Sequence, residues 1–244
     1  MFEKIKEDKF IQMYSEFATS VNKKVYVVGG AVRDILLGLK RVTSEDIDLA
    51  TTISLEENIK FATENNILVK IKNRKLEVVE FSFNGTSYEV ARLRVEFYDS
   101  VNKHNPSNVR FVNSIEEDVI RRDFSINALY YDTHSNSLLD PINKGLEDIK
   151  VKRIQTVLDP NETFNVDPAR ILRLIELAGR TGFSIDEKTL ECAKLNANKI
   201  NDLTKQRIGV ENNRIYSKKY VNEDYNTYIK RVNKLIKELG ISGL

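Results

Sequence analysis

The chain has 244 residues, of which 41% are hydrophobic and 30% are charged, so it is long enough for one or two domains with a buried core. Its 38 Lys and Arg nearly balance 36 Asp and Glu, which argues against a long disordered tail but leaves room for a local basic surface that binds nucleic acid. The single cysteine excludes an intramolecular disulfide, and the presence of only two histidines argues against a zinc site built from histidines.

The first part of the chain, residues 1–155, alternates β-rich runs with helical runs and is expected to form an α+β domain. The Asn84-Gly85 pair predicts a tight hairpin turn between two strands. A polar run at 96–108, which contains a proline, predicts a loop. The expected strands are residues 25–28, 46–49, 67–71, 75–83, 87–93 and 128–131, and the expected helices are residues 31–37 and 55–65.

The second part, residues 156–244, is expected to be helical. Pro168 suits an early helical position, with Asp167 near the positive N-terminal end of that helix, and Gly182 is expected to end it. The apolar residues between them recur at the spacing of a buried helix face. Further helices are expected at residues 187–198, 205–216 and 225–239.

No segment predicts a membrane span or a secretory signal. No run approaches the roughly 18 consecutive apolar residues of a membrane-spanning helix, and the first ten residues, MFEKIKEDKF, are charged and have no apolar centre. We therefore expect a cytoplasmic protein, in which the thiol of Cys192 is a buried structural group.

A Gly29-Gly30 turn follows the first expected strand and opens a helix, within the segment GGAVRD. Two glycines permit a tight turn and let main-chain N–H groups approach an anion closely. The guanidinium group of Arg33 can add bidentate hydrogen bonds to phosphate. A Gly-Gly turn by itself is more often only a turn. Considered together with the acidic residues that follow it, this segment indicates a phosphate site.

Asp46 and Asp48 are two residues apart in an expected strand, so they share one face of it. Two adjacent carboxylates repel unless a cation lies between them, and Mg²⁺ is the usual cation where phosphoryl groups are moved. Taken alone, the pair is equally compatible with a solvated strand edge, but its position shortly after the glycine turn favours a metal site. Glu89, in the strand run YEVARLR, is either a third acid of this site or an exposed strand residue.

Two further segments combine basic and hydrogen-bonding side chains. In RRDFSINAL, Arg122 can reach phosphate, while Asp123 and Asn127 can face one site or cap a helix. In VDPARILR, Asp167 and Arg170 are three apart and share a helix face. They can imitate the hydrogen-bonding edge of a base, although spacing alone favours an ordinary ion pair.

Taken together, six segments in this order resemble the class II tRNA nucleotidyltransferases, the family that includes the CCA-adding enzyme and bacterial poly(A) polymerase. Any one segment is weakly specific, but six in the family order are highly specific. A later helical segment, KQRIGVE, resembles a further family motif. The six segments are VYVVGGAVRDILLG, SEDIDLATT, YEVARLR, EEDVIRRDFSINALYYD, DPINKGLEDIKVKRI and VDPARILRLIELAGRTGF.

The resemblance implies an α+β fold, with a nucleotidyltransferase head built on a mixed or antiparallel sheet at residues 1–155 and an all-helical neck and short body at 156–244. It implies template-independent addition of C and A to the 3′ end of tRNA, from CTP and ATP, with release of pyrophosphate. Two Mg²⁺ ions would be bound by Asp46 and Asp48. The triphosphate and ribose would be held by Gly29, Gly30, Arg33, Arg122, Asp123 and Asn127, the base would be selected by Asp167 and Arg170, and Asp34, Glu89 and Arg173 are further candidates.

The sequence departs from the family pattern in three places. Val166 occupies the position of a family glutamate that would help to fix Arg170, and KIKNRKLEVVEF replaces the usual His-Gly-Thr segment before Glu89. The chain is also much shorter than many members, so the body and tail that grip tRNA would be reduced. Basic residues beyond residue 198 form a candidate surface for phosphate contacts.

Several functions are compatible with the resemblance. CCA addition is the first choice, because the 96–108 loop favours an enzyme that can add A, and no basic histidine-containing segment marks a poly(A) polymerase. CC-only addition, A-only addition and poly(A) synthesis are the alternatives within the family. A non-catalytic RNA-binding relative is disfavoured by the acid pair beside the glycine turn, and a protein or small-molecule acceptor is disfavoured by Asp167 and Arg170.

Overall fold

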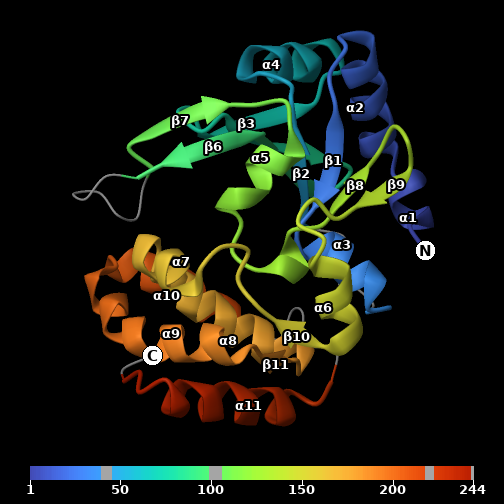
Figure 1. Ribbon diagram of the computed structural model, residues 1–244. Coiled ribbons are helices and arrows are strands. Elements are labelled where there is room, and N and C mark those ends of the chain that lie inside the picture. Colours follow the sequence, from blue (N-terminus) through green and yellow to red (C-terminus); the bar gives the residue numbers. More distant parts are fainter. Residues whose placement is uncertain (40–45, 99–105, 218–222, 243–244) are drawn as a thin grey trace.

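The computed structural model describes residues 1–39, 46–98, 106–217 and 223–242, and for Asp46 only the backbone. Figure 1 shows two parts, a sheet with its helices and a group of helices packed below it. Across the described ranges, no helix combines the length and apolar character needed to cross a bilayer.

A seven-stranded mixed sheet forms the first part, in the order β3-β4-β5-β2-β1-β8-β9. Strands β2 and β5 are parallel and the other neighbours are antiparallel, so of the two expected alternatives, a mixed or an antiparallel sheet, the sheet is the mixed one. The hairpin expected at Asn84-Gly85 is also confirmed, since Phe83 pairs with Thr86 and both turn residues have positive φ. The strands are β1 (Val25–Val28), β2 (Asp46–Thr51), β3 (Leu68–Asn73), β4 (Val78–Phe83), β5 (Thr86–Arg92), β8 (Tyr130–Asp132) and β9 (Ser137–Leu139).

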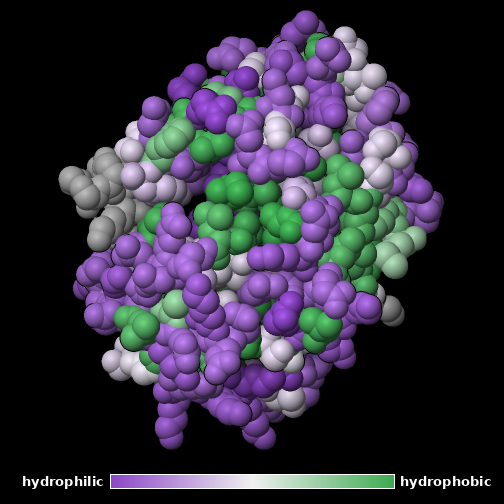
Figure 2. Space-filling model, in the orientation of Figure 1, coloured by the Kyte–Doolittle hydropathy of each residue, from purple (hydrophilic) through white to green (hydrophobic). Residues whose placement is uncertain are grey.

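Two helices, α2 (Lys9–Ser20) and α4 (Leu55–Glu64), cover one face of the sheet, and α1 (Glu3–Lys6) precedes them (Figure 1). Phe10 and Tyr14 of α2 contact Phe81 on β4 and bury an aromatic cluster under the helix. Helix α2 was not predicted, although its buried residues recur about every four positions. The other face carries a buried apolar cluster under α5 (Ile115–Asp118). On the surface, Figure 2 shows a patch of apolar residues in the middle of the view.

The loop prediction for 96–108 was wrong at both ends. Strands β6 (Arg94–Phe97) and β7 (Asn108–Phe111) form an antiparallel pair, and the Ser107 N–H donates to the Phe97 carbonyl at 2.8 Å. The strand pattern was missed because Val, Phe and charged residues alternate only at the ends of the polar run. Residues 99–105, the middle of the expected loop, lie outside the described residues.

A short 3₁₀ turn separates the RRD segment from β8. It comprises Ser125–Asn127, and a second turn, Val119–Arg121, follows α5. Strand β8 therefore begins at Tyr130, two residues after the expected start at 128. The turn brings Asn127 close to Asp123, to which it donates a hydrogen bond.

The helical part is organised around α8 (Ala169–Thr181), against which α10 and α11 pack. Helix α8 ends at Gly182, whose φ of 66° confirms the expected stop. Phe124 and Ile126, from the first part of the chain, are buried in the same core as α8, so this core joins the two parts. The other elements are α6 (Gly145–Val151), β10 (Arg153–Ile154), α7 (Pro160–Val166), β11 (Ser184–Ile185), α9 (Glu187–Asn196), the 3₁₀ helix Ala197–Asp202, α10 (Lys205–Ile215) and α11 (Tyr225–Glu238).

Candidate functional site

A strongly charged cleft of about 680 Å³ lies between the sheet and the α8 and α10 helices. Eight cationic and five anionic side chains line it, so it is suited to a polyanionic ligand that also needs carboxylates nearby. Many residues singled out in the sequence meet here. Those that line the cleft are Gly30, Arg33, Asp48, Glu89, Arg122, Asp123, Asn127 and Arg173.

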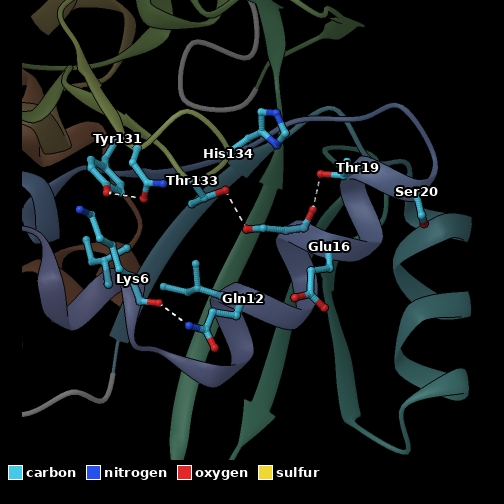
Figure 3. A pocket seen from close by; sticks show the side chains of 12 residues that line it. Lys6, Gln12, Glu16, Thr19, Ser20, Tyr131, Thr133 and His134 are labelled. Atoms are coloured by element: carbon cyan, nitrogen blue, oxygen red, sulfur yellow. Dashed lines mark hydrogen bonds between the residues drawn. The ribbon is translucent and has the colours of Figure 1, made fainter.

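A second hollow, of about 710 Å³, lies between α2 and the turn that follows β8 (Figure 3). Its polar groups bond to one another: Ser15 donates to Thr133 at 2.7 Å, and Tyr131 donates to Asn136 at 2.9 Å. No residue predicted to have a function lines it. The charged cleft is therefore the candidate site.

The glycine turn and the acidic strand adjoin at the cleft. Gly29 has a φ of 68°, which favours glycine, and a Cβ atom there would lie 3.4 Å from Oδ2 of Asp48. Asp48 is exposed on β2, and β2 pairs with β5 so that Asp48 stands opposite Glu89. Partial desolvation and then the charge of Asp48 raise the pKa of Glu89. The backbone of Asp46 begins β2, while its side chain lies outside the described part of the chain.

Arg122 is held against the wall of the cleft by two partners. Its Nε donates to the Tyr130 hydroxyl at 2.7 Å, and its Nη2 lies 3.3 Å from Oδ2 of Asp118. Asp118 is fully buried and also pairs with Arg121 at 2.9 Å. Burial by itself would raise the pKa of Asp118, but Arg121 and Arg122 outweigh it and lower that pKa to about 2. Asp118 was not predicted as a functional residue, because an acid in a short helical turn carries no signal of its partners in the sequence.

Asp123, Asn127 and Arg33 are joined by hydrogen bonds at the floor of the cleft. Asp123 accepts from Arg173 Nε at 2.7 Å and from Asn127 Nδ2 at 3.4 Å. Arg33 Nη1 donates to Asn127 at 2.5 Å. Burial alone would raise the pKa of Asp123, but Arg173 and then Arg170 lower it to about 2. The structure thus brings these predicted residues together and binds them to one another.

Asp167 and Arg170 lie where α7 meets α8, beside the wall of the cleft. Asp167 directly precedes Pro168, the N-cap of α8, and accepts from the N–H of Ala169, the first residue of the helix, at 3.1 Å. Arg170 Nη2 donates to the carbonyl of Arg121, a cleft residue, at 2.8 Å. Arg207 of α10, in the segment KQRIGVE, lies 3.8 Å from Oδ2 of Asp167. The pair is therefore held by the wall of the cleft and by α10.

Fold and site together define a class of protein: an α+β head whose acidic strand borders a basic cleft, joined by one arginine-rich helix to a helical neck. The family model described as the poly A polymerase head domain matches residues 25–155, which is more than half of the chain. The chain belongs to this family, the tRNA nucleotidyltransferases and poly(A) polymerases, as its motifs predicted.

Curated relatives and solved structures agree with the family assignment. A CCA-adding enzyme of Streptococcus uberis is 34% identical over 218 residues, which cover 85% of this chain and 51% of the relative. A CCA-adding enzyme of Oceanobacillus iheyensis is 35% identical over 198 residues, or 81% and 47% of the two chains. The crystal structure of the Bacillus stearothermophilus CCA-adding enzyme in complex with CTP has a TM-score of 0.77 at 25% identity, covering 96% of this chain and 53% of that one. The chain thus spans about half the length of the curated relatives that it matches.

Proposed function

We propose that the chain adds C and A nucleotides to the 3′ end of tRNA, without a template, from CTP and ATP and with release of pyrophosphate. One observation carries the proposal: Asp48 borders the Gly29 turn at a cleft lined by eight cationic side chains, in a chain of this family. The relatives named above support the choice of CCA addition. Two further similar solved structures, a CCA-adding enzyme with ATP and a tRNA nucleotidyltransferase with a primer tRNA and an incoming ATP analog, support ATP and tRNA as substrates.

Two Mg²⁺ ions would be held by Asp46 and Asp48. The exposed carboxylate of Asp48 beside Glu89 offers the hard oxygen ligands that Mg²⁺ prefers. Among the described side chains no group of three His, Cys, Asp or Glu residues gathers, and Mg²⁺ commonly completes its shell with water and substrate phosphate. When bound, the metal activates the RNA 3′-hydroxyl and neutralises the charge of the triphosphate.

The remaining cleft residues position the substrates in this proposal. Arg122 and Arg173 direct positive charge at the triphosphate, while Asp123 and Asn127 offer hydrogen bonds to ribose. Positioning and charge neutralisation account for most of the rate in phosphoryl transfer, and these groups supply both.

Arg170 is proposed to select the base together with Asp167, and its loss tests that role. Arg170→Ala should reduce the discrimination between CTP and ATP by roughly 1–3 kcal/mol, the worth of one bidentate contact to a base edge. The measurement is kcat/KM for each nucleotide at a defined position of the primer. Arg110→Ala is the matched control, because Arg110 forms an exposed ion pair with Glu117 away from the cleft. Unchanged selectivity in the Arg170 variant would remove this residue from base selection.

A primer-extension assay tests the proposed function itself. The purified chain, Mg²⁺ and a tRNA transcript without its 3′ CCA are given CTP, ATP or both, and products are sized at single-nucleotide resolution. Three added nucleotides with both substrates are expected. A stop after CC or after a single A identifies a partial-addition enzyme, and long A-only products identify a poly(A) polymerase. No extension by the folded protein contradicts the proposal and favours a non-catalytic RNA-binding relative.

A further inference from the structure

One buried network links helix α8 to the glycine turn. Starting on α3 (Gly30–Leu36), Arg33 donates to Asp34 Oδ1 from Nε at 2.9 Å and from Nη2 at 2.7 Å. Arg180, near the end of α8, reaches the same carboxylate, with Nη2 lying 3.1 Å from Oδ2 of Asp34. Residues 146 positions apart in the sequence therefore share one carboxylate.

The network closes on α8 at a second arginine. From Arg33 it continues through Asn127 to Asp123, and Asp123 is bound by Arg173. Because Arg173 and Arg180 are seven residues apart, or two helical turns, both lie on the face of α8 that meets the head. One helix face thus holds both ends of a chain of hydrogen bonds that runs beneath the cleft.

The charged groups at the Asp34 end of this network are largely buried. Arg33 is 3% exposed, Asp34 is 4% exposed, and the side chain of Arg180 is 10% exposed. Two guanidinium groups share the Asp34 carboxylate, and Glu176, one turn before Arg180 on α8, pairs with Arg180 at 3.1 Å. Buried charges keep such arrangements only when each has its partner, so loss of Arg180 removes the ion pair of Glu176 and one of the two guanidinium partners of Asp34.

The network also touches the glycine turn directly. A Cβ atom at Gly30 would lie 3.4 Å from Arg33 Nη2 and 3.9 Å from Arg180 Nη2. The two guanidinium groups therefore lie beside Gly30, on the side to which its Cβ would point. Arg180 thus adjoins the turn directly and is linked to Arg33 through Asp34.

We propose that Arg180 is a positioning residue that fixes the position of the Gly29-Gly30 turn relative to the base-selecting helix α8. The inference rests on the proposed function and adds to it a residue to which the motifs assigned no role. Its predicted signature is specific: loss of Arg180 weakens the use of the triphosphate that CTP and ATP share, and leaves the choice between them unchanged. Loss of Arg170, in contrast, changes that choice.

The test compares Arg180→Met, Arg180→Lys and a matched control in steady-state extension with CTP and with ATP. Arg180→Met is expected to raise KM for both nucleotides about tenfold or more, because a misplacement of about 1 Å in a positioned site can cost a hundredfold. Arg180→Lys keeps the charge and one contact to Asp34, so a smaller rise is expected, and it decides the question if the methionine variant does not fold. Arg153→Met is the control, because Arg153 pairs with the buried carboxylate of Asp148 at 2.8 Å and does not line the cleft. It is expected to leave KM unchanged.

Two results would overturn the inference. If both Arg180 variants lose thermal stability while KM stays at the wild-type value for both nucleotides, Arg180 is only structural. If the ratio of kcat/KM for CTP and ATP shifts instead, Arg180 acts on the base.

Calorimetric titration of each variant with CTP and ATP, without RNA, separates this inference from the proposed function. If the wild-type chain binds the triphosphates but does not extend RNA, the proposed function is disproved. The ratios of variant to wild-type Kd, for CTP and for ATP, still decide the role of Arg180.

Discussion

Asp48→Asn should abolish nucleotide addition, by at least about a thousandfold, while the protein stays folded. The expected loss follows from the several kcal/mol of charge stabilisation that a bound metal supplies, at about 1.4 kcal/mol for each factor of ten. The fold should persist because Asp48 is exposed, while its neighbour Leu49 is buried and β2 is held by backbone pairing on both sides. Primer extension at fixed Mg²⁺ measures the loss, and circular dichroism checks the fold.

Asp132→Asn is the matched control for this prediction. Asp132 is a carboxylate in the same sheet, on β8, and it does not line the cleft. It accepts hydrogen bonds from the N–H groups of His134 and Ser135, which the amide oxygen of asparagine can still accept. Activity near the wild-type level is expected for this control. Full activity of Asp48→Asn, or of Asp46→Asn, at ordinary Mg²⁺ would show that the pair does not hold the metals.

Asp118→Asn should lower the free energy of unfolding by about 3 kcal/mol, because it leaves buried positive charge without its partner. The Asp118 carboxylate is fully buried and accepts from the Tyr130 hydroxyl at 2.6 Å and from the Arg94 N–H at 3.0 Å, besides Arg121 and Arg122. Urea denaturation of the full chain measures the change. Glu117→Gln, one residue away, removes only a half-exposed pair with Arg110 and should change stability by less than about 0.5 kcal/mol.

The same variant should change how stability depends on pH. The folded-state pKa of Asp118 is about 2, below its ordinary value of 3.8, so its stabilisation is present above pH 4 and is lost as the pH falls toward 2. That shift corresponds to about 2 kcal/mol. Asp118→Asn lacks this component, so its unfolding free energy should fall less steeply between pH 4 and pH 2 than that of the wild type. Parallel profiles for the two proteins would disprove the ion-pair assignment.

Much of the secondary structure could be predicted from local patterns. The strand before Gly29, the acidic strand, the hairpin at Asn84-Gly85 and the stop at Gly182 were all expected and are all present. Each is determined by neighbours in the chain: apolar runs of strand length, a turn pair that adopts positive φ, and a glycine after a helix. Where the local pattern was mixed, as at the β6–β7 hairpin, the prediction was wrong.

The motif residues could be predicted as a set, but their contacts could not. Arg33, Asp123 and Asn127 were each expected to face a ligand, whereas the hydrogen bonds that join them to one another were not expected. Asp167 was expected near the N-terminal end of α8 and lies there, but its approach to Arg207 of α10 was not expected. Spacing along one element indicates which residues share a face, but it carries no information about what packs against that face.

By itself, the sequence determined the family, the acid pair and the glycine turn, because short segments with their own turn and strand preferences carry all three. Only the tertiary structure decided that Asp118 is the buried partner of Arg121 and Arg122, and that Arg180 shares a carboxylate with Arg33. The physical reason is that burial of a charged side chain costs free energy unless an opposite charge lies beside it. A charged side chain is stable inside the protein only beside its partner, and when the two are far apart in the chain, packing of the helical neck on the head brings them together.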